Sequence, residues 1–103
     1  METHFTFRNM EASDALKGHT LDKLEKLNKY LIKPETVHMI FHLERFQHVA
    51  EVTLSANGIR YVSHDRAPDM YTAIDGAVAK LESQLKKYKE RLKRHKDKIR
   101  KRR

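Results

Sequence analysis

The chain has 103 residues, no cysteine and a formal net charge of +8. This length supports one domain with one hydrophobic core, and the absence of cysteine excludes disulfides, a thiol nucleophile and a cysteine-ligated zinc site. No apolar run approaches the ~20 residues that a membrane-spanning helix needs. The first ten residues lack the basic and apolar regions of a signal peptide, so we expect a cytoplasmic protein.

The first third of the sequence predicts a strand followed by a helix. Residues 4–8 alternate, with Phe5 and Phe7 on one face, which is typical of a strand with one buried face. Ser13 is a suitable N-cap for a helix that we expect to run to about Leu31. One flank of this helix contains basic and aromatic side chains and no carboxylate: His19, Lys23, Lys26 and Tyr30.

The middle of the sequence predicts three more strands, at residues 37–44, 49–56 and 59–64. Each of them alternates between apolar and polar residues, which indicates one buried and one wet face. Residues 45–47 are expected to form the first turn. Asn57-Gly58 is the second, because a type I′ turn requires positive φ at both of its central positions.

A long helix is predicted from Asp69 to His95. Asp69 follows Pro68 and is a good N-cap, and apolar side chains recur on one face from Met70 to Leu92. One flank beside this face is almost entirely basic and consists of Lys80, Lys87, Arg91, Arg94 and Lys98. A solvated helix usually mixes both signs along each face, so a surface for a polyanion explains this flank better than a plain solvent-exposed helix end.

The positive charge is concentrated in the last quarter of the chain. Residues 80–103 contain 13 Lys and Arg and three acidic residues, a net charge of +10, whereas residues 1–79 have a net charge of −2. Such asymmetry is typical of proteins that bind nucleic acid or an anionic membrane. A membrane-surface helix would favour Trp or Phe on its apolar side, whereas this helix has Leu, Ile, Val and Ala.

The predicted order is β-α-β-β-β-α, an α+β fold with a four-stranded sheet and both helices on one face. Strands 1 and 2 should be parallel if they are neighbours, and the next three strands should form an antiparallel meander. If the two helices lie side by side, their basic flanks could merge. We expect a single domain at residues 1–95 and a flexible basic tail at residues 96–103.

Three segments of the long helix form a family pattern: residues 69–75 (DMYTAID), 80–82 (KLE) and 84–87, where Gln84, Leu85 and Lys87 match. Earlier positions fit the same pattern, namely Glu11, Ala15, Leu16, Lys23, Lys26, Leu27 and the Asn57-Gly58 turn. The sequence thereby resembles the ribosome hibernation factors, the family of hibernation promoting factor and protein Y. The resemblance covers residues 1–95 and implies a fold similar to the double-stranded RNA-binding domain.

The resemblance implies a non-enzymatic protein that binds the small ribosomal subunit where mRNA and the A- and P-site tRNAs lie, and that silences translation in stationary phase or stress. The basic positions of the family carry over onto Lys23, Lys26, Lys80, Lys87 and Arg91, while Arg94 and Lys98 extend the same flank. Ser83 departs from the pattern, since relatives often have Arg there. The implied partners are the small subunit and its rRNA, with no cofactor, metal, membrane or small-molecule substrate.

The basic carboxyl-terminal segment resembles that of short hibernation promoting factors, which favour ribosome dimers together with ribosome modulation factor. Protein Y instead ends in an acidic extension, and long factors add a dimerisation domain. The 103 residues are also compatible with a fragment of a long factor.

Two further alternatives remain open at this point. An enzyme is conceivable because the chain has seven histidines, but His38 and His42 would lie about 13 Å apart along one strand and could not share a metal. A free-standing double-stranded RNA-binding protein is the stronger competitor. Co-sedimentation with small subunits, compared with retention of naked duplex RNA, would separate it from a ribosome-binding factor.

Overall fold

The computed structural model describes residues 1–32 and 35–101, with side chains described as far as Arg91. Its elements are β1 (Glu2–Arg8), α1 (Asp14–Glu25), the 3-10 helix η1 (Asn28–Tyr30), β2 (Thr36–Glu44), β3 (Gln47–Ala56), β4 (Ile59–Ala67) and α2 (Met70–Lys101). The predicted β-α-β-β-β-α order is therefore confirmed.

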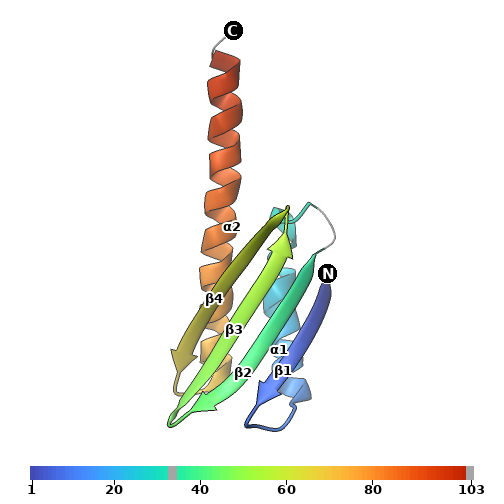
Figure 1. The fold of residues 1–103 in the computed structure, drawn as a ribbon, viewed down its shortest axis with the longest axis vertical. Coiled ribbons are helices and arrows are strands. Elements are labelled where there is room, and N and C mark those ends of the chain that lie inside the picture. The colour runs from blue at the N-terminus through green and yellow to red at the C-terminus, as the bar shows by residue number, and fades with distance from the viewer. Residues whose placement is uncertain (33–34, 102–103) are drawn as a thin grey trace.

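The four strands form one sheet in the order β1-β2-β3-β4. β1 and β2 are parallel, and the other two neighbouring pairs are antiparallel. Figure 1 shows both helices on the same side of the sheet, with no element of the described chain over its other face. This arrangement confirms the predicted α+β sheet with one covered face.

The core lies between the sheet and the two helices. Val37, Met39 and Phe41 of β2 are fully buried, as their alternation predicts. From the helices, Leu24 of α1 and Leu81 of α2 pack into the same cluster. Leu43 continues this alternation, but it is 39% exposed because it lies beside the β2–β3 hairpin at the end of the sheet.

Helix α1 is shorter than its apolar pattern predicts. The Ser13 cap is confirmed, since its Oγ accepts a hydrogen bond from the Leu16 N–H at 3.2 Å, but the helix ends at Glu25 and not near Leu31. The chain tightens there into η1, where Asn57 of the β3–β4 turn binds backbone groups on both sides of Leu31. Leu27, Tyr30 and Leu31 still pack against the core at helix-like spacing, so the apolar pattern does not mark the end of α1.

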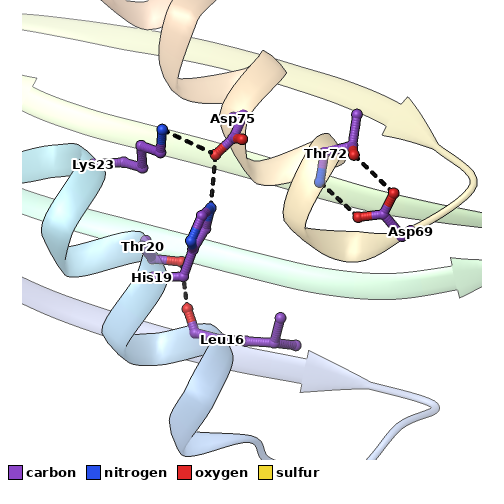
Figure 2. Close-up of polar contacts among 7 residues, drawn as sticks. All are labelled: Leu16, His19, Thr20, Lys23, Asp69, Thr72 and Asp75. Atoms are coloured by element: carbon purple, nitrogen blue, oxygen red, sulfur yellow. Dashed lines mark hydrogen bonds and ion pairs between the residues drawn. The ribbon is translucent and has the colours of Figure 1, made fainter.

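The start of α2 is fixed by the predicted cap. The Asp69 carboxylate accepts hydrogen bonds from the Thr72 N–H at 2.9 Å and from the Thr72 hydroxyl at 2.7 Å (Figure 2). Both bonds lower the pKa of Asp69 from its usual value, and the bond from the backbone N–H of Thr72 has the larger effect. The stability that the cap contributes is therefore complete above the unfolded-state pKa and is lost as pH falls through the lowered folded-state pKa.

Helix α2 extends to Lys101 and not to residue 95, and its carboxyl-terminal half projects well beyond the sheet (Figure 1). Part of the segment expected to be a flexible tail thus continues the helix.

We still predict that residues 96–103 move freely in the unbound protein, because like charges are dense there. Their amide protons should exchange with little protection while those of residues 70–90 are strongly protected, and strong protection as far as Arg103 would contradict it.

Candidate nucleic-acid interface

The basic flank of α2 runs along the β4 side of the helix. Lys87 and Arg91 are exposed there, whereas Lys80 is tied to the sheet. Its ammonium donates hydrogen bonds to the His64 carbonyl at 3.0 Å and to Asp65 Oδ1 at 3.3 Å. Lys80 is therefore held against β4, whereas Lys87 and Arg91 form no ion pair with the side chains that the structure describes.

The same flank covers the free edge of the sheet. β4 is an edge strand, and Gln84 donates a hydrogen bond to its Val62 carbonyl at 2.9 Å, alongside the bond from Lys80 to His64. On the buried side, the Ser63 hydroxyl donates to the Ala77 carbonyl at 2.7 Å. These contacts hold α2 in a fixed orientation on β4.

The basic residues of α1 lie against an acidic side of α2. Asp75 Oδ1 is 2.7 Å from His19 Nε2 and 3.6 Å from Lys23 Nζ (Figure 2). The His19 ring also meets Tyr71 edge-on, with ring centroids 5.0 Å apart. Lys26 is exposed. Much of the positive potential of the α1 flank is therefore balanced by a carboxylate from the other helix.

The two predicted basic flanks do not merge into one. Asp75 and Glu82 of α2 line the groove beside Lys23 and Lys26, whereas Lys80 lies on the β4 side of α2. At 100° per residue, the acidic pair and the basic flank are separated by roughly 120–180° around the helix. The sequence of each helix does not show this, because it depends on which side of α2 packs against α1.

The predicted site therefore divides into three groups. Lys23 and Lys26 lie at the groove between the helices, and Lys80, Lys87 and Arg91 lie on the far flank of α2. Arg94 and Lys98 belong to the same helix, but their side chains lie outside the described residues.

A further basic cluster lies on the α1 side of α2 and was not predicted. Lys29 and Lys89 place their ammonium groups 5.3 and 5.8 Å from the centre of the Tyr30 ring. Lys86 lies 3.7 Å from Glu82, one helical turn away. Only the i,i+4 spacing of this last pair was visible in the sequence; the Tyr30 contacts depend on the turn at η1.

The Asp65 side chain explains a glycine in the second turn of α2. A Cβ on Gly76 would lie 1.7 Å from Asp65 Oδ2 and 2.6 Å from its Cγ. We therefore expect Gly76→Ala to lower the free energy of unfolding by about 1–3 kcal/mol through overpacking, although Ala favours helix by ~1 kcal/mol. Urea denaturation measures the change.

Gly18 of α1 is the matched control. Nothing lies within 4 Å of the position that its Cβ would occupy. Gly18→Ala should therefore raise the free energy of unfolding by about 0.5–1 kcal/mol, the intrinsic helix preference of Ala. Stabilisation of similar size in both variants would show that Asp65 does not restrict the space at Gly76.

Two histidines of the open sheet face lie close to polar neighbours. His38 Nε2 lies 2.7 Å from the Thr6 hydroxyl, and His42 Nε2 lies 3.6 Å from Glu51 Oε1. Among the residues whose positions are described, no cluster of three or more His, Asp or Glu is arranged to hold a metal ion. Within the same part of the chain, no helix is long and apolar enough to cross a membrane.

Comparison with known proteins places this architecture in a family. Residues 3–93 match the family model described as Sigma 54 modulation protein / S30EA ribosomal protein. The ribosome hibernation promoting factor of Salmonella typhimurium is 34% identical over 88 residues, which span 85% of this chain and 93% of that protein.

Two solved structures share the fold. The N-terminal domain of Thermus thermophilus protein Y superposes with a TM-score of 0.80 at 28% identity, covering 85% of this chain and 99% of that domain. A ribosomal subunit interface protein from Coxiella burnetii gives a TM-score of 0.76 at 28% identity, covering 87% of this chain and 99% of that one. The chain therefore belongs to the Sigma 54 modulation protein / S30EA ribosomal protein family, which includes the hibernation promoting factors and protein Y.

Proposed function

We propose that this protein is a ribosome hibernation factor that binds the small ribosomal subunit in the channel for mRNA and the A- and P-site tRNAs. Family membership and the names of its relatives support this function. The structural observation that carries it is the exposed basic flank of α2, with Lys87 and Arg91 held in place by the Lys80 and Gln84 contacts to β4.

The mechanism is occlusion. Lys and Arg on a rigid helix gain affinity for rRNA by releasing the counterions condensed on its phosphates. Arg91 can also bind a phosphate through two parallel hydrogen bonds. Once bound, the sheet and its two helices fill space that tRNA needs, so binding alone silences translation and no catalytic group takes part. Arg94 and Lys98, which belong to the same helix, are proposed to add further contacts.

The proposed biological setting is that of the hibernation promoting factors. The chain covers 93% of the Salmonella hibernation promoting factor. We assign it the corresponding role, which is to promote or stabilise inactive ribosome dimers in stationary phase or stress, together with ribosome modulation factor. It needs no cofactor or small-molecule substrate for this role, and a ribosomal partner places it in the cytoplasm.

Sedimentation with purified small subunits tests this function. The protein should co-sediment with the subunits at low salt and be released as salt rises, because each phosphate contact adds to the salt dependence. A naked RNA duplex of 20 base pairs serves as the comparison. Stronger retention on the duplex than on the subunit would support a free-standing double-stranded RNA-binding protein instead.

A further inference from the structure

Phe46 at the tip of the β2–β3 hairpin is the most exposed large apolar side chain of the described residues. It is 94% exposed, compared with 79% for Ile32 and 55% for Val62. Single exposed apolar residues are common on protein surfaces and need no function. The case for Phe46 therefore depends on the turn that carries it and on the charges around it.

The two hairpins of the sheet differ in their turn residues. Both have two-residue loops, because Glu44 pairs with Gln47 and Ala56 pairs with Ile59. The second loop uses Asn57-Gly58, the sequence that the positive φ angles of 55° and 75° favour. The first loop has Arg45 at a φ of 53°, a conformation that L side chains rarely adopt, followed by Phe46. Turn geometry alone does not explain the Arg-Phe sequence.

The surroundings of the Phe46 ring are basic. Arg45, Phe46 and Arg66 line an open hollow at the tip together with Glu44 and Gln47. Arg66 forms an ion pair with Glu44, which fixes one guanidinium beside the loop, while Arg45 is exposed. Two arginines and one carboxylate give the tip a net positive charge next to a free aromatic face.

This tip is connected to the basic flank of α2 through the end of β4. Arg66 directly follows Asp65, the residue that binds Lys80. In Figure 1 the β2–β3 hairpin and the end of β4 lie at the same end of the sheet, where α2 begins. A polyanion that lies along Lys80, Lys87 and Arg91 would therefore approach the hairpin at the amino-terminal end of α2.

We propose that Phe46 stacks on an unpaired base of the small-subunit rRNA, while Arg45 and Arg66 bind the adjoining phosphates. The inference rests on the proposed function and adds a second contact to it. An aromatic face stacks on any base and needs no sequence-specific hydrogen bond, and single-stranded rRNA presents such bases. The net positive charge beside the ring favours nucleic acid over an apolar pocket on a ribosomal protein.

Substitutions at Phe46 separate stacking from apolar burial. Phe46→Ala and Phe46→Leu should each weaken binding to purified small subunits about tenfold, the loss expected for one stacked base, while Phe46→Trp should bind as tightly as the unaltered protein or more tightly. Val62→Ala, which shortens an exposed apolar side chain on the open sheet face, should leave the affinity unchanged. Near-native binding by Phe46→Leu would indicate an apolar protein pocket and overturn the proposal.

Fluorescence provides a second measurement. The chain has no tryptophan, so Phe46→Trp introduces a single indole at the hairpin tip. Stacking on a base should quench its emission when small subunits are added, whereas a blue shift with increased intensity would indicate a protein pocket and overturn the proposal. Thermal unfolding of all variants should match that of the unaltered protein, because the replaced ring is almost fully exposed.

The outcomes distinguish this inference from the proposed function. If the unaltered protein binds the small subunit and Phe46→Ala binds equally well, the stacking contact is wrong and the proposed function stands. If the unaltered protein does not bind the subunit, both fail.

Discussion

Replacing Lys87 and Arg91 together by Glu is expected to abolish binding to the small ribosomal subunit. Both side chains are exposed on the β4 side of α2, so the change reverses two charges that would face rRNA phosphates and leaves the core intact. Sedimentation with subunits at several salt concentrations measures the effect. A single Lys87→Ala should lower the magnitude of the slope of log K against log salt by about one.

A matched reversal on the other side of the molecule serves as the control. Arg8 and Arg60 are exposed, and their strand positions place them on the open sheet face. Their double replacement by Glu changes the net charge by the same amount and should have a much smaller effect. If it weakens binding as much as the reversal at Lys87 and Arg91, the sheet is the contact surface and the helix-flank proposal fails.

Leu81→Ala should lower the free energy of unfolding by about 2–5 kcal/mol, the usual consequence of removing a buried Leu side chain. Leu81 is 0% exposed and packs in the cluster between α2 and the sheet. Urea denaturation followed by circular dichroism measures the loss.

Lys87→Ala is the stability control on the same helix. Its side chain is exposed, and a substitution there should change the free energy of unfolding by less than ~0.5 kcal/mol. The opposite order of the two effects would mean that the apolar and basic faces of α2 had been assigned the wrong way round.

The sequence was sufficient to predict the fold because each element has a local signal. Alternation marked the strands, Ser13 and Asp69 marked the helix starts, and Asn57-Gly58 marked a hairpin; the structure confirms each of these. Hydrophobic periodicity also identified Leu81 as a core residue. These signals lie within a few residues of the feature that they specify.

The parts that could not be predicted depend on contacts between distant residues. The early end of α1 involves Asn57, which is 27 residues from Tyr30, and the Lys80 contact involves Asp65 on another element. Likewise, Asp75 faces His19 across the helix pair, which a view of each helix alone could not show. The sequence was also compatible with one merged basic surface, because it does not show that α1 packs on the Asp75 side of α2.

The cover that α2 provides for β4 has a consequence for self-association. An uncovered edge strand can pair with a strand of another chain and extend the sheet. Here Gln84 and Lys80 already occupy the carbonyls of Val62 and His64, so growth at β4 would first have to displace side chains of the protein's own helix. A phosphate of the partner would therefore compete with the His64 carbonyl and the Asp65 carboxylate for the Lys80 ammonium. If the phosphate draws Lys80 away from them, the edge strand that Lys80 protects is uncovered.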